Sequence, residues 1–530
     1  MIKWLRHVLG VHQRIVFRGK SQRIILLFIF LVLTPSGCNK SLGSQGGVPL
    51  VPPSLPSMVI SQPTPPLDSL NTPEIVTATE LPATPVVPTI TPTIDVTEHP
   101  PILYYTQAGD TLGAVSARFD VSKNEITSPD IIPDGVLLPP NQLLIIPNRI
   151  NDTGPGNPIF PDSEVVYSPS TVDFDISSFV KNAGGYLSTY REYSSMGWNT
   201  GAQVVYRVAV ENSINPRLLL AILEFQSHWV YGKPTNPDEI DYPVGWFDFK
   251  HRGLYLQLYW AVSQLSIGYY GWRNGSVTFI NFPEGTSLRL SPMLNAGSVG
   301  VQFLFSKLYE KPLWAGALYS PNSLTALYEK MFGNPFVIAQ AVEPILPATL
   351  TQPIMELPFL PGYSWSYTRG PHSVWGPDEA LAAIDFAPGS LVPGCVETTK
   401  KATASAPGVV VRSGNGVVVI DLDGDGFEQT GWALLYMHMA THERVAVGTW
   451  VNTDDPIGFP SCEGGIATGT HLHFARKYNG EWIPADGPVP FVLSGWQAHE
   501  GSEPYAGTLT KGNKTITSSP FSSFESAIVR

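Results

Sequence analysis

The sequence predicts a multidomain protein: a small α+β unit, then a mainly α-helical region, then a C-terminal all-β region built on an antiparallel sheet. Three observations support this prediction. The 530 residues are too many for a single hydrophobic core. Proline-rich stretches divide the chain, and its 50 prolines and 48 glycines exceed what a purely globular chain carries. Helical periodicity dominates the middle, whereas short β-rich runs separated by turns dominate the end.

The N-terminus has the features of an export signal. Basic residues precede an apolar run at 24–33, and small residues then lead to Cys38. We predict a signal peptide over 1–37 and a lipidated Cys38, similar to bacterial lipoproteins, so that the exported protein is anchored to the cell membrane in the cell envelope. An uncleaved anchor is the alternative, but the run is short for a membrane span. Residues 38–101, rich in Pro, Thr and Val, are predicted to be an extended linker.

The segment 102–149 is the predicted α+β unit. A strand at its start leads through a turn at Gly109-Asp110 into a helix with one apolar face, and a second strand closes the unit. The run Tyr-Tyr-Thr-Gln-Ala-Gly-Asp-Thr-Leu that begins at Tyr104 resembles LysM modules. This resemblance implies that the unit binds N-acetylglucosamine-containing glycans. Residues 150–172 are predicted to be a linker.

Residues 173–345 form the predicted helical domain. Asn215-Pro216 is a good helix start, with Asn as the cap and Pro at the first helical position. The helix that follows, 217–227, resembles the active-site helix of lysozyme-like lytic transglycosylases, in which a glutamate directly before a serine is the general acid. Gln226 occupies that position here and cannot donate the proton. We predict a lysozyme-like domain that is not catalytic, and its binding of glycan is left open; a plain helical spacer is the alternative.

After a proline-rich linker predicted over 346–360, the all-β domain is predicted to cover 361–501. Runs of valine at 409–411 and 417–419, separated by a glycine-containing loop, predict a hairpin. The tail, 502–530, is polar and rich in Ser and Thr, and it is predicted to be disordered.

The motif His471-Leu472-His473-Phe474 is the most informative stretch of the chain. Because the side chains of a strand alternate between its faces, we expect the two histidines on one face, with Leu472 and Phe474 in a core. Two imidazoles one strand-step apart suit a metal ligand beside a catalytic base. Further candidate residues precede the motif in the order His372, Asp385 and His438.

This ordered set resembles that of lysostaphin-type (LytM-like) zinc endopeptidases, which cut peptide cross-links in bacterial cell walls. The resemblance implies Zn2+ as the cofactor, three metal ligands and two catalytic histidines. The implied ligands are His372, Asp385 and His473. The implied catalytic residues are His438 and His471, of which one moves protons and the other stabilises the oxyanion.

The spacing of the first two ligands departs from the family pattern, in which the first His and the Asp lie four residues apart. We interpret residues 374–384 as an inserted loop that projects beside the cleft, with both flanking strands preserved. Asp378 is the competing ligand, closer in sequence to His372 but placed among turn-forming residues.

Two further patterns concern the C-terminal region. Cys395 and Cys462 are the cysteines left in an exported chain and favour a disulfide, with two free, buried thiols as the alternative. The acidic run 421–426 has carboxylates at positions one, three and five and Gly at six, as calcium loops do, but position twelve is Trp432. A solvated turn is therefore the expected structure of this run.

Charge and motifs together lead to a predicted function. The net charge of −12 argues against nucleic acid as a partner. We predict a zinc metalloendopeptidase that hydrolyses peptide cross-links of peptidoglycan, with glycan, stem peptides and the membrane as its partners. Two alternatives stay open. One is an inactive wall-binding protein that activates a partner hydrolase, and the other is a glycan-cleaving enzyme that works through residues 216–230, which Gln226 opposes.

Overall fold

The computed structural model describes residues 99–194, 197–376 and 380–530, all of which belong to one compact unit of the chain. The predicted signal peptide, the lipidation site Cys38 and the linker up to residue 98 lie outside the described residues. Within the described ranges, no helix combines the length and the apolar character needed to cross a membrane.

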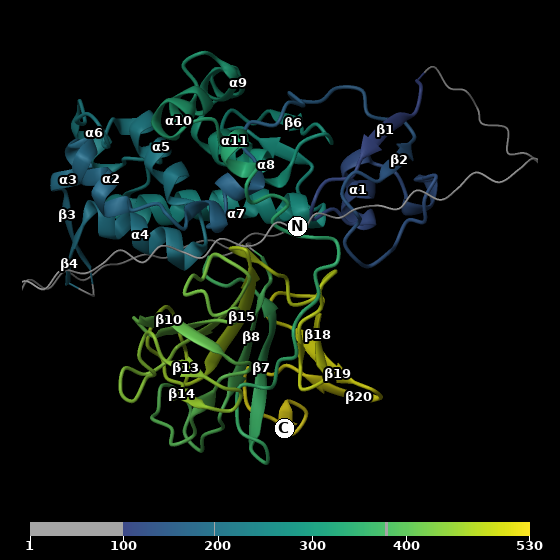
Figure 1. Ribbon diagram of the computed structural model, residues 1–530, viewed down its shortest axis with the longest axis vertical. Helices are drawn as coiled ribbons and strands as arrows, with labels where there is room; N and C mark the ends of the chain where they lie inside the picture. Colours follow the sequence, from purple (N-terminus) through teal and green to yellow (C-terminus); the bar gives the residue numbers. More distant parts are fainter. Residues whose placement is uncertain (1–98, 195–196, 377–379) are drawn as a thin grey trace, which may run out of the picture. The chain divides into compact units, whose positions relative to one another are not determined.

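The N-terminal part of the described chain is a small α+β unit, labelled β1, α1 and β2 in Figure 1. Strands Ile102–Tyr105 (β1) and Leu143–Ile146 (β2) pair in antiparallel fashion. Helix Leu112–Phe119 (α1) begins after Thr111, whose hydroxyl accepts a backbone N–H of the first turn. These elements agree with the predicted α+β unit, while its LysM character stays a prediction.

The prediction of a linker over 150–172 is wrong. Ile159, Phe160 and Val165 are buried in the hydrophobic core of the helical region. Proline, glycine and polar residues give this segment the composition of a spacer, but burying its apolar side chains is worth more than leaving them in water. The helical domain therefore begins before the predicted boundary.

The middle region is helical, as predicted. Its helices are Ile176–Ala183 (α2), Tyr186–Thr189 (α3), Gly201–Asn212 (α4), Pro216–Ser227 (α5), Pro237–Asp241 (α6), Leu254–Asn274 (α7), Ala296–Leu308 (α8), Lys311–Tyr319 (α9), Leu324–Phe332 (α10) and Pro335–Ala339 (α11). Two short hairpins join them, Arg191–Ser194 (β3) with Gly197–Thr200 (β4) and Phe279–Asn281 (β5) with Ser287–Arg289 (β6). The side chain of Asn215 accepts the N–H of Arg217, with Pro216 as the first helical residue, so α5 starts where the sequence predicts.

The C-terminal region is built on an antiparallel sheet, also as predicted. Its strands follow the order β13-β10-β11-β12-β15-β8-β7-β21, with β16 paired to β15. They are Ser364–His372 (β7), Ala383–Ala387 (β8), Gly408–Gly414 (β10), Val417–Asp421 (β11), Trp432–Met437 (β12), Trp450–Val451 (β13), Leu472–Tyr478 (β15), Glu481–Trp482 (β16) and Ala527–Val529 (β21). Strands β10 and β11 form the predicted hairpin.

Smaller sheets complete this region. Strands Val492–Leu493 (β17), Trp496–Glu500 (β18), Gly507–Lys511 (β19) and Lys514–Thr517 (β20) form a four-stranded antiparallel sheet. Figure 1 shows β18, β19 and β20 in yellow beside β7. Strands Ala402–Thr403 (β9) and Pro456–Gly458 (β14) pair with each other.

Two cores lie on opposite faces of the large sheet, and successive side chains alternate between them. Along β15, Leu472 and Phe474 are buried in the core of the β region, as predicted, whereas Ala475 belongs to the core shared with the helices. His473 alternates with Phe474 and so points to the second face. Asp385 lies opposite His473 on β8 and shares that face.

The prediction of a disordered tail over 502–530 is wrong. Strands β19 and β20 come from this segment, and β21 pairs with β7 in the large sheet. Ile516 and Ile528 are buried in the β core. A Ser/Thr-rich sequence suits a strand with one buried face as well as it suits a tail, so composition alone does not separate the two. The β domain therefore extends beyond residue 501.

The predicted linker over 346–360 contains no helix or strand, which agrees with the prediction. Met355, Leu357 and Phe359 are nevertheless buried in the β core. The segment is therefore packed along its second half and belongs to the β domain rather than forming a free joint.

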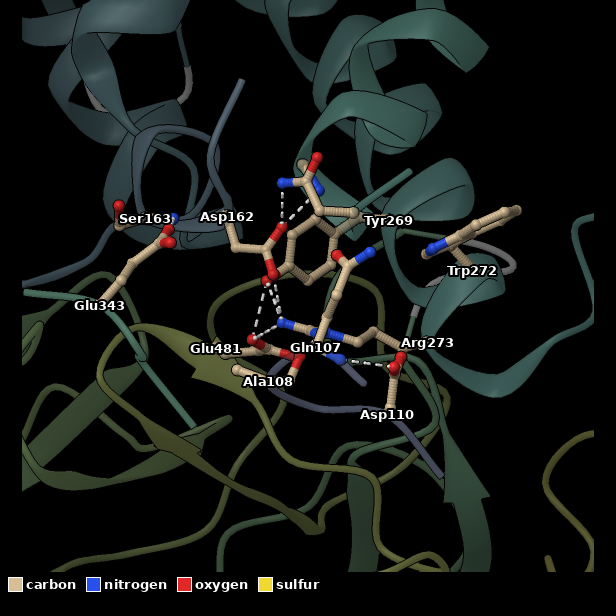
Figure 2. A network of polar contacts seen from close by, with 12 residues as sticks. Gln107, Ala108, Asp110, Asp162, Ser163, Tyr269, Trp272, Arg273, Glu343 and Glu481 are labelled. Atoms are coloured by element: carbon tan, nitrogen blue, oxygen red, sulfur yellow. Dashed lines mark hydrogen bonds and ion pairs between the residues drawn. The ribbon is translucent and has the colours of Figure 1, made fainter. Parts of the chain in front are cut away.

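Arg273, near the end of α7, joins three parts of the chain, as Figure 2 shows. Its Nη2 donates to Asp162 at 2.8 Å and to Glu481 on β16 at 3.0 Å, and its Nε donates to Glu481 at 2.9 Å. Its Nη1 donates to the carbonyl of Ala108 in the N-terminal unit. The hydroxyl of Tyr269 donates to Glu481 at 2.8 Å. Because an unpaired buried charge is costly, these contacts hold the three parts together.

A second group of contacts fixes the N-terminal unit to the helices. Arg118 pairs with Asp110 at 2.6 Å and donates to the carbonyl of Trp272 at 2.8 Å. The side-chain amide of Gln107 donates to the carbonyl of Met293 at 3.1 Å. The turn that carries the LysM resemblance is therefore packed against the helical region, and Asp110 is only 1% exposed.

Candidate metal centre

Three strands of the large sheet bring the predicted ligands together. Strand β7 ends at His372, β8 carries Asp385 and β15 carries His473. Asp385 and His473 are direct cross-strand partners, and His372 pairs with Ala383 on β8. Paired positions of neighbouring strands share a face. The carboxylate and the two imidazoles therefore converge, although the two histidines lie 101 residues apart in sequence.

The converging atoms form a small triangle. Nε2 of His372 lies 3.0 Å from Nδ1 of His473 and 3.3 Å from Oδ1 of Asp385. Nδ1 of His473 lies 3.1 Å from Oδ1 of Asp385. In a tetrahedral zinc site with ligand distances of roughly 2.0–2.1 Å, the ligand atoms lie about 3.3 Å apart. The triangle therefore has the size that zinc requires at three of its four corners.

Backbone contacts determine which nitrogens face this triangle. Nδ1 of His372 lies 2.8 Å from the carbonyl oxygen of Gly370, and because that oxygen only accepts, Nδ1 carries the hydrogen. Nε2 of His372 is then left with its lone pair toward the cluster, as in metal-bound histidines. Nε2 of His473 is buried and lacks a hydrogen-bond partner among the described residues, so this ring contacts the cluster only through Nδ1.

The site is buried and carries one negative charge among imidazoles. His372, Asp385 and His473 are 5%, 1% and 4% exposed. Burial opposes ionisation of Asp385, but His372 and His471 outweigh it and lower the pKa of Asp385 well below its usual range. Burial lowers the pKa of His473, which favours the neutral ring. A buried carboxylate facing two imidazoles is a donor set that fits Zn2+.

The two predicted catalytic histidines lie beside the ligands. Nδ1 of His438 lies 3.0 Å from the carbonyl oxygen of Glu463, and Nδ1 of His471 lies 2.7 Å from that of Gly469. Both carbonyls only accept, so each Nδ1 carries a hydrogen and each Nε2 is left for another partner. The ring centroids of His438 and His473 lie 6.1 Å apart. The structure thus brings all five predicted residues into one site.

Electrostatics give the two histidines different surroundings. Burial and the neighbouring rings of His471 and His473 lower the pKa of His438 to about 3, so its ring is neutral at neutral pH. Nε2 of His471 lies 3.5 Å from Oδ2 of Asp385, the carboxylate oxygen that does not belong to the triangle. A zinc ion held by the triangle would supply Lewis acidity, which makes water a nucleophile at neutral pH and polarises an amide carbonyl. A neutral His438 can accept a proton.

A disulfide joins Cys395 and Cys462, whose Cα atoms lie 5.8 Å apart. The N–H of Val396, next to the first cysteine, donates to the hydroxyl of Thr470 at 2.9 Å. The residue after the second cysteine is Glu463, which supplies the carbonyl that orients His438. The bridge therefore ties together the backbone segments that position the two catalytic candidates.

The insertion between the first two ligands differs from its prediction. Strands β7 and β8 flank it as expected, and Asp378 lies outside the described residues. Its described ends do not project freely. Val374 and Ala380 are buried in the core shared with the helices, and the carbonyl of Trp375 accepts the hydroxyl of Tyr259 at 3.4 Å. This segment therefore forms part of the contact between the β domain and the helical region.

Two residues at the site were missed by sequence reasoning. Arg369 lies opposite Asp385 on β7, with its Nε 3.7 Å from Oδ2. Tyr505 places its ring 5.0 Å from the ring of His372 and 4.5 Å from the guanidinium carbon of Arg369. Nothing in the local sequence marks either residue. Tyr505 belongs to the segment predicted as a tail, and only the pairing of β18 with β19 returns it to the site.

The acidic run begins at Asp421, the last residue of β11, and Asp421 and Asp425 accept hydrogen bonds from within the run or just after it. Asp421, Asp423 and Asp425 approach one another closely enough to share an ion. Asp421 accepts the backbone N–H groups of Asp423 and Gly426 at 3.1 Å and 2.9 Å. Burial and the neighbouring Asp423 raise the pKa of Asp421 to about 7. These bonds form a turn, as expected, but Asp421 is buried rather than solvated.

The helix α5 carries Gln226 and Glu224, the two residues that bear on the role of a general acid. Oε1 of Gln226 accepts the hydroxyl of Tyr309 at 2.8 Å. The carboxylate of Glu224 accepts the backbone N–H groups of Val230 and Tyr231 at 2.8 Å and 2.9 Å, so it is engaged in ending the helix. Neither side chain stands ready as a general acid, and the lysozyme-like character of the domain stays a prediction.

Two family models match the chain. Residues 158–344 match the model described as LasA, N-terminal domain, and residues 395–484 match the model described as peptidase family M23. The second match includes His438, His471 and His473 but begins after His372 and Asp385. The C-terminal region therefore contains a domain of the M23 (lysostaphin-type) metallopeptidase family, and the region before it is homologous to LasA.

Curated relatives agree with these matches. Protease LasA of Pseudomonas aeruginosa, from two strains, is 28% identical over 297 residues, which cover 52% of this chain and 65% of that protein. The chain thus spans just under two thirds of the length of the relatives it matches. Among solved structures, the M23 metalloprotease pseudoalterin is 24% identical with a TM-score of 0.27, covering 32% of this chain and 96% of that one. The catalytic domain of lysostaphin from Staphylococcus simulans is 22% identical with a TM-score of 0.17, covering 23% and 89%.

Proposed function

We propose that this protein is a zinc-dependent endopeptidase that hydrolyses peptide cross-links of bacterial peptidoglycan. One observation carries the proposal: three buried donor atoms, from His372, Asp385 and His473, face one point with separations of 3.0–3.3 Å, and His438 and His471 lie next to them. This arrangement provides three metal ligands together with two histidines, one to move protons and one to stabilise the oxyanion. The M23 family match supports the reaction class.

The substrate class is proposed on the same family resemblance and on the predicted export of the chain. Lipidation at Cys38 would hold the enzyme at the membrane surface, and the segment up to residue 98 would set its reach toward the wall. The unit 102–149 is proposed to contact glycan through residues outside its LysM-like turn. That turn is occupied by contacts with the helical region, as in the pairing of Gln107 with Met293.

A digestion experiment tests the function. The full chain is incubated with purified peptidoglycan, with and without a metal chelator, and the new ends are identified by mass spectrometry. New amino groups that disappear with chelator and in His473→Ala are the expected result. Anhydro- or reducing sugar ends would instead indicate glycan cleavage. Absence of any product from the zinc-loaded protein would overturn the proposal in favour of an inactive wall-binding protein.

A further inference from the structure

The two oxygens of Asp385 face different partners. Oδ1 belongs to the triangle with His372 and His473, whereas Oδ2 lies 3.5 Å from His471 and 3.7 Å from Nε of Arg369. Arg369 is the permanent cation in this set, because a guanidinium does not lose its proton in proteins. Asp385 itself is fully buried, so the direction of its carboxylate depends on these neighbours.

The backbone brings Arg369 to this position through an irregular stretch of β7. Arg369 is the register partner of Asp385, and the pairing of β7 with β8 shifts on both sides of it, between Tyr367 and Arg369 and between Arg369 and His372. Such irregularities redirect side chains and are common beside active sites. The result is a cation and a metal ligand that come from the same four-residue stretch of one strand.

Arg369 also contacts the loop between β18 and β19. Its guanidinium carbon lies 4.5 Å from the ring centroid of Tyr505, within the range of a cation–π contact. That ring lies 5.0 Å from His372. The loop is held close by the N–H of Gly370, which donates to the carbonyl of Tyr505 at 2.7 Å. A Cβ at Gly370 would meet the carbonyl oxygen of Ala506 at 2.4 Å, so only glycine allows this approach.

We propose that Arg369 is a positioning residue of the metal centre: it holds Oδ2 of Asp385 so that Oδ1 faces the two histidines, and it keeps the ring of Tyr505 against His372. The proposal rests on the metal centre proposed above. Arg369 acts on two metal ligands: on Asp385 through its charge, and on His372 through the ring of Tyr505. Residues that orient metal ligands in this way contribute roughly 10–100-fold to metal affinity.

The test measures zinc affinity rather than turnover. Wild-type full chain, Arg369→Gln and Arg369→Lys are titrated with zinc against a chromophoric chelator at a fixed neutral pH. We expect Arg369→Gln to weaken zinc binding by roughly 10–100-fold and Arg369→Lys, which keeps the charge, by less than about tenfold. The matched control is Arg530→Gln, because Arg530 pairs with Asp454 and Glu356 in the same domain but not with the site. The control should bind zinc as the wild type does.

A double variant tests the second contact. If Arg369 acts partly through the aromatic ring, Arg369→Gln combined with Tyr505→Leu loses less zinc affinity than the product of the two single losses. Tyr505→Phe, which keeps the ring, should bind zinc nearly as the wild type does. Unchanged zinc affinity in both Arg369 variants would overturn the proposal.

The outcome also separates this proposal from the proposed function. A wild-type chain that binds no zinc, or that binds it equally well after His473→Ala, contradicts the metal centre itself. If the chain binds zinc through His473 but neither Arg369 substitution changes the zinc affinity, only the positioning role is contradicted. Melting temperatures of the metal-free variants, equal to that of the metal-free wild type, show that a lost affinity is not lost folding.

Discussion

The imidazole rings of His438 and His471 lie with their centroids 4.4 Å apart and their planes inclined by 48°. His438 directly follows β12 and His471 directly precedes β15, and these two strands pair with each other in the sheet. His438 reaches its position in a left-handed backbone conformation, with φ at 65°. Residues other than Gly rarely adopt this backbone conformation, and residues with strained backbones are concentrated at functional sites.

Metal binding should depend on the three ligands, whereas this histidine pair should serve catalysis without binding the metal. We expect His438→Ala and His471→Ala to keep one bound zinc per chain while peptidoglycan hydrolysis falls by roughly 10²–10⁴-fold, the usual contribution of general acid–base groups. His473→Ala should lose both zinc and activity. Metal analysis of the purified variants beside the digestion assay checks this. Loss of zinc from His438→Ala would assign the residue to the ligand set instead.

The disulfide should matter for stability and for the site together. It closes a loop with a sequence separation of 67, which the loop-entropy model values at about 4 kcal/mol. Replacing Cys395 and Cys462 together by serine should therefore lower the free energy of unfolding by about that amount, as measured by denaturant unfolding. Activity should fall as well, because Glu463 and Thr470 lose their tether. Equal stability of the oxidised wild type and the double variant would contradict this account.

Glu343 should destabilise the fold at neutral pH. The residue as a whole is exposed, but desolvation of its carboxyl group and the nearby charge of Asp162 raise its pKa, against the opposing effect of Arg273. An acid with a raised folded-state pKa stabilises the protein below its unfolded-state pKa and loses that contribution as the pH rises through the folded-state value. Glu343→Gln can still accept the N–H of Ser163, which now lies 2.8 Å from the carboxylate. Because solvent screens a carboxylate on an exposed residue, we expect this substitution to raise the melting temperature at neutral pH by no more than about 2 °C.

The pH dependence separates this effect from a packing effect. The gain from Glu343→Gln should vanish below about pH 4, where the wild-type carboxyl is protonated in both states. Glu310→Gln, at another exposed position, is the matched control and should change little. A destabilised Glu343→Gln at neutral pH would show that the charge is needed there.

Glu428 should behave in the opposite way. Burial opposes its ionisation, but Arg412 at 2.8 Å and Lys477 at 2.9 Å outweigh burial and lower the pKa of Glu428 to about 2. A depressed folded-state pKa gives stability above the unfolded-state value of about 4.3, and that stability is lost as the pH falls toward 2. The contribution at neutral pH is of the order of 3 kcal/mol.

Melting curves between about pH 2 and 7 check the Glu428 prediction. Glu428→Gln should be clearly less stable than the wild type near neutral pH, and the gap between them should narrow as the pH falls below about 5. The side chain of Lys477 also reaches Ser213 of the helical region at 3.4 Å, so the loss should loosen the contact between the helices and the β domain. A gap that stays constant with pH would refute the ion pair as its cause.

Local sequence was enough to predict much of the fold. Alternating Leu472 and Phe474 correctly indicated a strand with its core on one side, because the period of a strand depends on nearest neighbours alone. The cap and first turn of α5 were predicted for the same reason, since Asn215 and Pro216 act on adjacent backbone groups. The boundaries failed at 150–172 and 502–530, where polar composition concealed side chains that become buried only against distant partners.

The sequence by itself determined the set of five candidate residues, His372, Asp385, His438, His471 and His473, and their order along the chain. The tertiary structure decided that Asp385 turns one oxygen to the histidines and the other to Arg369, and that Tyr505 returns to lie beside His372. The physical reason is the distance along the chain over which each effect acts: helix and strand propensity and the alternation of side chains depend on neighbours in sequence. The direction of a buried carboxylate depends instead on charges that only the pairing of strands brings within a few ångströms.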